Sequence, residues 1–283
     1  MADLYLGIEK TILMEDNRDC DILHWKSSQQ GNIKEITLND LQQYKFIVID
    51  GNIGSGKSTI FEMMQNLIKK YNCFPFCNKP ICFIKEPVEE WLVSPSCSDT
   101  ETENKSIFEL FNENHEKYAF LFQIKVFTSR INAILKGIET FKKENGLNPF
   151  YVVCDRSLIG DKIFFDIQDA SYIEKGIYQG IHEIMCKNII DRYCLMIYVN
   201  TDYKECEKRI KNRERSSESK ITQEYLLSIQ NGHTTMIAET FKPNPIYTKC
   251  GFINCTWPDA LTDQKKDARI YALLYHIDRN FSV

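Results

Sequence analysis

The sequence predicts an α/β fold in which a five-stranded parallel sheet carries helices on both faces. Three observations lead to this prediction. Short runs of β-branched and apolar residues alternate with longer helical patterns along the chain. A glycine-rich loop joins the first of these runs to the helical pattern that follows it. Alternation of strand and helix is typical of parallel sheets that are covered on both sides.

Five apolar runs are the predicted strands of this sheet. They span residues 45–50, 81–86, 151–155, 194–200 and 246–254. Ligands of such sheets bind beyond the carboxyl ends of the strands. The residues that close each run are therefore the first candidates for a functional site.

The composition is that of an ordinary globular protein with one main core. The chain has 283 residues, of which 43% are hydrophobic and 26% are charged. Residues 1–43 are mixed and polar without a clear period, so we predict an N-terminal extension there and a single domain over 44–283. We find no internal repeat.

Charge and cysteine usage limit the partners and the compartment. The net charge of −4 and the pI near 5.8 do not indicate the basic surface that nucleic-acid-binding proteins have. Small substrates are therefore expected rather than a nucleic-acid polymer. The eleven cysteines are scattered, and several lie in apolar runs, which indicates reduced thiols in an intracellular compartment. No apolar run approaches the roughly 20 residues that span a bilayer, so no membrane association is expected.

The first strand runs into a loop with the pattern of a phosphate-binding site. Glycines let consecutive backbone N–H groups close around phosphate oxygens, Lys57 supplies positive charge, and the Ser58 hydroxyl can bind Mg²⁺. The helix that opens near Lys57 adds the positive end of its dipole. The loop therefore predicts ATP or a similar donor. The predicted ATP-binding residues of this loop are Gly51, Asn52, Ile53, Gly54, Ser55, Gly56, Lys57, Ser58 and Thr59.

The second and third strands also end in charged residues. Glu86 precedes Pro87, which stops the strand, and this carboxylate is the candidate general base. Asp155 and Arg156 follow the third strand, where the aspartate can hold Mg²⁺ and the arginine can bind a phosphoryl oxygen or clamp the base. A solvated strand-end glutamate and a purely structural ion pair are the alternatives. Three strand ends at one edge favour a common site.

Two helical segments carry further candidates. Within residues 119–143, one stripe contains Phe122, Gln123, Val126 and Arg130, and its polar members favour a role beyond the core. Residues 208–215 concentrate positive charge, and a serine-rich stretch follows them. This second segment is either a solvated helix face or a lid over about 209–220 whose arginines close over the phosphoryl group.

Taken together, these motifs resemble the deoxyribonucleoside kinases of the deoxycytidine kinase and deoxyguanosine kinase type. The resemblance covers about residues 45–240. It implies a P-loop kinase fold with an arginine-rich lid that transfers the γ-phosphoryl group of ATP, with Mg²⁺, to a deoxyribonucleoside 5′-hydroxyl. The motifs that carry it are Gly51–Thr59, Glu86–Trp91, Phe122–Gln123, Asp155–Ser157 and Arg209–Glu218.

The resemblance also implies a role for each matching position. The implied catalytic residues are Glu86, Arg156 and Lys57, and the implied metal site is formed by Ser58 and Asp155. Gln123 matches the residue that bonds the base edge, Arg130 and Asp161 match the pair around the base, and Phe165 matches a stacking ring. The remaining implied ligands are the lid arginines Arg209, Arg213 and Arg215 for ATP, and Val88, Trp91, Asn112, Phe122, Val126 and Glu218 for the nucleoside.

One position departs from the family pattern. Asn112 stands where these kinases usually have a tyrosine that bonds the sugar 3′-hydroxyl. Either Asn112 makes that bond or a nearby residue replaces it, so the selectivity for deoxyribose stays open. The Arg130 and Asp161 pair predicts deoxycytidine or a deoxypurine over thymidine, because a carboxylate accepts from the exocyclic amine that thymidine lacks.

Two other functions stay in competition at this point. One is a nucleoside monophosphate kinase of the same architecture, and the other is an inactive nucleotide-binding accessory subunit. The carboxylate of Glu86 disfavours the first, since it would repel a bound monophosphate. The resemblance further implies a homodimer formed through helices near 120–143 and 175–191.

Overall fold

The centre of the protein is a five-stranded, fully parallel sheet. The computed structural model describes residues 36–71, 79–94, 105–190, 193–213, 218, 221–240, 251–256 and 263–281. The strand order is β2-β3-β1-β4-β5, which confirms the predicted fold class. The strands are β1 (Lys45–Gly51), β2 (Ile81–Ile84), β3 (Tyr151–Asp155), β4 (Tyr193–Val199) and β5 (Gly251–Cys255).

Two strands differ from their predicted bounds. The predicted run 81–86 is paired with β3 only as far as Ile84, which lies opposite Cys154, so Glu86 stands two residues beyond the ladder. Residues 246–250 of the last predicted strand lie outside the described part of the chain, and β5 begins at Gly251. Glu86 therefore sits on a loop, farther from the end of its strand than the sequence predicted.

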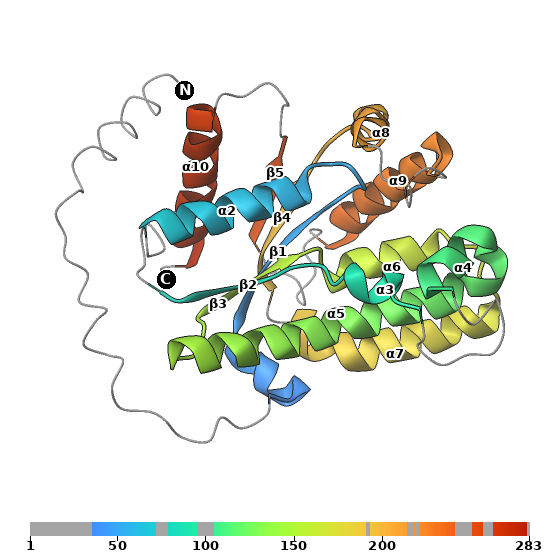
Figure 1. The fold of residues 1–283 in the computed structure, drawn as a ribbon, viewed down its shortest axis with the longest axis horizontal. Helices are drawn as coiled ribbons and strands as arrows, with labels where there is room; N and C mark the ends of the chain where they lie inside the picture. The colour runs from blue at the N-terminus through green and yellow to red at the C-terminus, as the bar shows by residue number, and fades with distance from the viewer. Residues whose placement is uncertain are drawn as a thin grey trace.

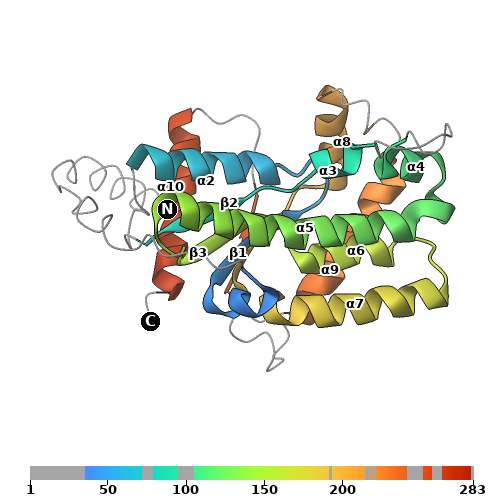
Figure 2. The same ribbon diagram turned by 60° about the horizontal axis from the view of Figure 1, so that its bottom comes forward.

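One face of the sheet is covered by α2 (Lys57–Tyr71) and α10 (Asp263–Phe281), which contact each other and cross in Figures 1 and 2. Alternate residues of the central strands meet these helices in a buried apolar cluster. Strand residues such as Ile47 and Ile49 contribute to it, together with Phe61 of α2 and Leu274 of α10. Because β1 is buried on both faces, it fixes the start of the loop that follows it.

The opposite face is covered by α5 (His115–Asn145), α6 (Leu158–Asp166) and α7 (Tyr172–Ile190). The 3₁₀ helix η2 (Leu38–Gln43) contacts α7 and adds Leu41 to the same core. Leu41 belongs to the predicted extension 1–43, whose first 35 residues lie outside the described part of the chain. The boundary at residue 43 stays a prediction.

Helix α5 is longer than the predicted helix over 119–143 because both of its ends are capped. The Asn114 side chain accepts a hydrogen bond from the backbone N–H of Lys117 at the N-terminus. Gly146 ends the helix in the left-handed conformation, with φ of 66°. The stripe from Phe122 to Arg130 is therefore held within a continuous 31-residue helix.

The remaining helices surround the carboxyl end of the sheet. The short helices α3 (Glu89–Leu92) and α4 (Ile107–Glu113) lie against α5 (Figure 2). Helix α9 (Gln223–Thr240) contacts both α6 and α8 (Tyr203–Asn212). In the described ranges, no helix has the length and apolar character needed to cross a membrane.

Candidate active site

The glycine-rich loop between β1 and α2 is packed tightly against its neighbours. Gly51 has φ of 145°, and a Cβ atom there would lie 2.6 Å from the backbone oxygen of Val199 in β4. Gly54 has φ of 75°, and its Cβ would lie 2.7 Å from the backbone oxygen of Cys206 in α8. Side chains at these positions would both strain and displace the loop, so glycine is needed for its shape.

Lys57 is a buried cation at the first turn of α2. Its Nζ donates a hydrogen bond of 2.6 Å to the backbone oxygen of Asn52. Burial, together with the nearby Arg156, lowers the pKa of Lys57 to about 8. The loop is also contacted by Arg209 of α8, whose Nη1 donates to the backbone oxygen of Ser55 at 2.9 Å. An anion bound at this loop would meet a desolvated cation at a helix N-terminus.

The pKa of Lys57 predicts how triphosphate binding depends on pH. A bound polyanion favours the ammonium form and raises the pKa, so binding takes up a proton above about pH 8. We expect the affinity to be constant just below that pH and to fall by up to about tenfold per unit above it. Calorimetry of an ATP analogue with Mg²⁺, in two buffers of different ionisation enthalpy, measures both quantities. An affinity that stays constant well above pH 8, without proton uptake, would contradict this expectation.

Glu86 is held between two arginines. Its Oε1 accepts hydrogen bonds from Arg130 Nη2 at 2.9 Å and from Arg156 Nε at 3.3 Å. Burial alone would raise the pKa of Glu86, but the charges of Arg130, Arg156 and Lys57 lower it to about 2. The carboxylate is therefore ionised at neutral pH and has a fixed direction.

Arg156 links the ends of three strands. Its Nη1 donates to the backbone oxygen of Gly51 at 3.2 Å, while its Nε donates to Glu86. The guanidinium lies 4.4 Å from the ring centre of Phe164. Arg156 has φ of 79°, an uncommon value for a residue other than glycine, and such backbone strain is concentrated at functional sites. The predicted convergence of Glu86 and Arg156 on the glycine-rich loop is thus observed in the geometry.

Asp155 and Ser58 form a pair of oxygen ligands next to the loop. The Ser58 hydroxyl donates to Asp155 Oδ2 at 2.9 Å. Asp155 Oδ1 is buried and has no hydrogen-bond partner within the described part of the chain. Burial raises the pKa of Asp155, and the negative charge of Glu86 adds to this effect. An unsatisfied carboxylate oxygen beside a hydroxyl fits the oxygen ligands that Mg²⁺ prefers.

Arg130 and Asp161 form a buried bidentate ion pair between α5 and α6. Arg130 Nε lies 2.7 Å from Asp161 Oδ2, and Nη2 lies 2.9 Å from Oδ1. Because the same Nη2 also contacts Glu86, this pair is connected directly to the candidate base. Gln123 is 3% exposed on the same stripe of α5.

The predicted aromatic residues belong to two separate clusters. Trp91 meets Phe122 edge to face, and its indole N–H donates to the Ser129 hydroxyl at 2.8 Å. Phe165 lies elsewhere, on α6, and stacks on Tyr178 of α7 with ring centres 3.9 Å apart. One face of the Phe165 ring is therefore already covered. Of the two aliphatic candidates, Val126 is buried and Val88 is exposed.

The predicted lid residues are only partly described. Arg213 and Glu218 form a bidentate ion pair, with Nε to Oε2 at 2.6 Å and Nη2 to Oε1 at 2.7 Å. Both were predicted to bind substrates, and here they bind each other. Arg215 lies outside the described residues. Asn112 is half-buried on α4 next to Phe111, which stacks on Phe122.

Sequence reasoning assigned no role to Asp50, which contacts Arg156, or to the two residues that contact Asp50, Ser157 and His233. Asp50 is completely buried and accepts from Arg156 Nη1 at 3.4 Å, from Ser157 and from His233. A charged residue closing an apolar strand was the available signal for Asp50. Ser157 was included only as part of a motif. No local signal marks His233, because its partner lies 183 positions away.

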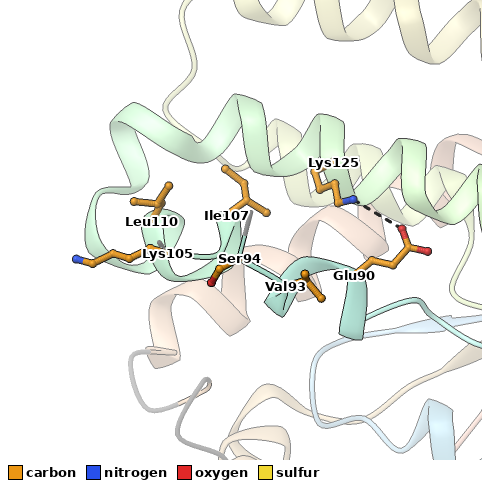
Figure 3. A pocket seen from close by; sticks show the side chains of 7 residues that line it. All are labelled: Glu90, Val93, Ser94, Lys105, Ile107, Leu110 and Lys125. Atoms are coloured by element: carbon orange, nitrogen blue, oxygen red, sulfur yellow. Dashed lines mark ion pairs between the residues drawn. The ribbon is translucent and has the colours of Figure 1, made fainter. Parts of the chain in front are cut away.

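A separate hollow of about 560 Å³ opens between α3, α4 and α5 (Figure 3). The ion pair between Lys125 and Glu90, 3.7 Å apart, lies at one side of it. It contains none of the predicted site residues. Its lining consists of Glu90, Val93, Ser94, Lys105, Ile107, Leu110 and Lys125.

Comparison with known proteins assigns this arrangement to one group of enzymes. The profile of the deoxynucleoside kinase family matches residues 47–269. Deoxycytidine kinase 2 of Gallus gallus is 26% identical over 224 residues, which cover 74% of this chain and 80% of the relative. Mitochondrial deoxyguanosine kinase of Xenopus laevis is 22% identical over 228 residues, which cover 76% and 81%.

A solved structure is similar as well. Deoxyadenosine kinase from M. mycoides with bound dCTP superimposes with a TM-score of 0.55. The match covers 82% of this chain and 99% of that one at 22% identity, so it supports the fold.

Proposed function

Since this chain belongs to the deoxynucleoside kinase family, we propose that it transfers the γ-phosphoryl group of ATP to the 5′-hydroxyl of a deoxyribonucleoside. The product is a deoxyribonucleoside 5′-monophosphate, as expected for nucleotide salvage. The relatives named deoxycytidine kinase and deoxyguanosine kinase share this class of reaction by name. The residue roles below are our proposals for this chain.

The observation that carries the proposal is the position of Glu86. One guanidinium, that of Arg156, contacts both the Glu86 carboxylate and the backbone oxygen of Gly51 in the loop. An acceptor hydroxyl at Glu86 would therefore lie beside phosphates held at the loop. Arg130 connects the same carboxylate to Asp161, which supports the proposal that the acceptor's base lies next to this pair.

The proposed reaction is a single displacement. The 5′-oxygen forms a bond to the γ-phosphorus, the bond from that phosphorus to the β,γ-bridging oxygen breaks, and ADP leaves. Glu86 accepts the proton of the hydroxyl and later releases it to solvent. Lys57 and the loop amides stabilise the donor phosphates, and Arg156 with the lid arginines Arg209, Arg213 and Arg215 neutralises the transferring group.

Ser58 and Asp155 are the proposed ligands of Mg²⁺. The buried Asp155 oxygen without a partner in the described residues fits this role. When bound, Mg²⁺ neutralises charge on the phosphates of ATP. The hydrogen bond from the Ser58 hydroxyl to Asp155 keeps the two proposed ligands together.

We predict that deoxycytidine or a deoxypurine is phosphorylated faster than thymidine. Asp161 is fixed by two hydrogen bonds from Arg130, but each carboxylate oxygen keeps a lone pair for an exocyclic amine. Thymidine offers no such amine. Side-by-side kinetics of the four deoxynucleosides measures the preference, and equal or better turnover of thymidine would refute it. The matching ribonucleosides in the same assay measure the selectivity for deoxyribose over ribose, which the presence of Asn112 left open.

The choice of phosphoryl acceptor distinguishes the proposed nucleoside kinase from the competing nucleoside monophosphate kinase. We expect 5′-monophosphate to form from a nucleoside, ATP and Mg²⁺, and little diphosphate to form from the nucleoside monophosphate, because an ionised Glu86 would repel it. Phosphorylation of the monophosphate alone would reverse this assignment. If no ATP is consumed in the presence of any nucleoside, the result would instead support the inactive accessory subunit.

The proposal includes a homodimer through α5 and α7. Large apolar side chains on α7 are exposed in the single chain, and Leu121 on α5 is 51% exposed. The α7 residues are Tyr172, Ile173, Ile177 and Ile184. Light scattering at micromolar concentration measures the assembly, and a monomeric mass would exclude the dimer.

A further inference from the structure

We propose that Asp50 and His233 are a positioning pair that fixes Arg156 for phosphoryl transfer. This inference rests on the proposed function and deepens it. Neither residue belongs to the sets assigned above to ATP, nucleoside or metal. The pair joins the end of β1 to α9, the helix that follows the predicted lid.

Asp50 organises the backbone and side chains around it. Its Oδ1 accepts from the backbone N–H of Gly51 at 2.8 Å, and from Arg156 Nη1 at 3.4 Å. Its Oδ2 accepts from the backbone N–H of Ser157 at 3.3 Å and from the Ser157 hydroxyl. One carboxylate therefore contacts the first residue of the phosphate-binding loop, the arginine and the residue after the arginine. Helix α6 approaches so closely that a Cβ at Gly160 would lie 2.9 Å from Oδ1.

His233 faces two hydrogen-bond acceptors. Its Nδ1 lies 2.9 Å from the backbone oxygen of Ile229, and its Nε2 lies 3.2 Å from Asp50 Oδ1. A carbonyl and an ionised carboxylate can only accept, so both contacts are hydrogen bonds only if both ring nitrogens carry a proton. The proposed pair therefore includes a ring that donates from both nitrogens, with the Tyr198 ring 5.4 Å away as its aromatic neighbour.

Asp50 thus lies between two cations, His233 and Arg156. Burial alone would raise the pKa of Asp50, but the hydrogen bond and charge of His233 and the charge of Arg156 hold it below its usual range. His233 Nε2 and Arg156 Nη1 contact the same oxygen, Asp50 Oδ1, so a hydrogen bond from His233 holds that oxygen in the position where Arg156 meets it. The ion pair is completely buried, so water does not screen it.

Arg156 needs such support because its backbone is in the left-handed region, with φ of 79°. A conformation of this kind persists only where the surrounding contacts hold it. Without Asp50, the guanidinium could turn further toward Glu86 and away from the phosphates. A misplacement of about 1 Å costs on the order of 10²-fold in rate. Helix α9 is tied to the loop a second time, since Asn52 Nδ2 donates to the backbone oxygen of Leu226 at 2.8 Å.

Two substitutions of His233 separate positioning from packing. The amide nitrogen of Gln occupies the place of Nε2, so His233→Gln keeps a donor to Asp50. The amide nitrogen of Asn occupies the place of Nδ1, so His233→Asn keeps only the donor to Ile229. We expect kcat of the Asn variant to be at least about tenfold below that of the Gln variant, with similar nucleoside KM. The reason is that only the Gln variant keeps the hydrogen bond to the charged carboxylate of Asp50.

The chain offers a matched control for this comparison. His182 of α7 is another buried histidine whose Nε2 contacts a backbone oxygen, that of Leu158, at 3.0 Å. Gln and Asn at position 182 are expected to give equal kcat values. Equal kcat at position 233, or losses at 233 that only follow the melting temperature, would overturn the proposal.

Asp50→Asn tests the other member of the pair. We expect kcat to fall about 10- to 100-fold while nucleoside KM changes little, since Asp50 contacts no proposed nucleoside ligand. Circular dichroism establishes whether this variant folds. If Asp50→Asn does not fold, the comparison of the two His233 variants tests the proposed positioning pair without it.

A measurement without substrate separates this inference from the proposed function. Side-chain ¹⁵N NMR of the free protein, with the His233 signal assigned by its loss in His233→Gln, reports protonation of both nitrogens. We expect both to be protonated at neutral pH, and a neutral ring would refute the pair even in an active enzyme. A wild-type protein that phosphorylates no nucleoside would instead refute the proposed function.

Discussion

Glu86→Gln is expected to lower kcat by about 10² to 10⁴-fold while the nucleoside KM stays within a few-fold of the wild type. The Gln side chain is nearly isosteric and can still accept from Arg130 and Arg156, but it takes up no proton at neutral pH. Binding is retained because the ion pair of Arg130 with Asp161 does not depend on Glu86. Steady-state kinetics with deoxycytidine and ATP·Mg²⁺ measures both parameters.

Glu89→Gln is the matched control for this substitution. Glu89 is exposed at the start of α3, three residues along the same segment, and it contributes no contact to the site. We expect wild-type kinetics from it. Near-normal kcat in Glu86→Gln would remove Glu86 from its proposed role.

The low pKa of Glu86 also specifies when the proton moves. A carboxylate with a pKa of about 2 is a weak base, so it accepts the proton only after the 5′-oxygen has begun to bond to phosphorus. Phosphoryl transfer through a loose transition state allows this order, because positioning and charge stabilisation supply most of the rate. The carboxylate therefore has to accept this late proton and also keep the direction that the two arginines set.

Lys57→Met is expected to lower kcat/KM by about 10² to 10³-fold, the usual cost of removing one charge-stabilising donor. Methionine fills similar space without the ammonium group. The substitution also removes a charge that burial destabilises, as the lowered pKa of Lys57 shows, so the melting temperature is expected to hold or rise. Activity falls while stability does not.

Lys69→Met on the exposed side of α2 is the control, and it is expected to leave both activity and stability close to the wild type. Kinetics and thermal unfolding of the two variants are measured together. A Lys57→Met protein that loses activity only in proportion to a lower melting temperature would contradict the proposed role of the ammonium group.

The sequence predicts those parts of the site that follow from strand order and local motifs. Glu86, Asp155 and the loop at Gly51 were placed together because parallel strands end at the same edge of a sheet. The pairing of Arg130 with Asp161 followed from the family resemblance. These positions need only the fold and the spacing along each element.

Contacts between side chains on different elements could not be predicted in this way. Arg130 reaches Glu86 across 44 positions, and His233 reaches Asp50 across 183. Both contacts depend on the angle at which α5 or α9 packs on the sheet, which no short pattern determines. For the same reason, the covering of Phe165 by Tyr178 was not foreseen.

The mutual pairing of lid residues has a different cause. Arg213 and Glu218 were each predicted as a substrate ligand, and in the structure the Arg213 Nε lies 2.6 Å from Glu218 Oε2. Two opposite charges five positions apart attract each other at this distance, and a motif that assigns each residue to a substrate does not include that attraction.

The most direct test of the account is a crystal structure with deoxycytidine and a non-hydrolysable ATP analogue. We predict the triphosphate at Gly51–Ser58, the base next to Arg130 and Asp161, and the 5′-oxygen within about 2.6–3.2 Å of the Glu86 carboxylate. A nucleoside bound with its 5′-oxygen away from Glu86 and from the γ-phosphate would contradict the proposed mechanism.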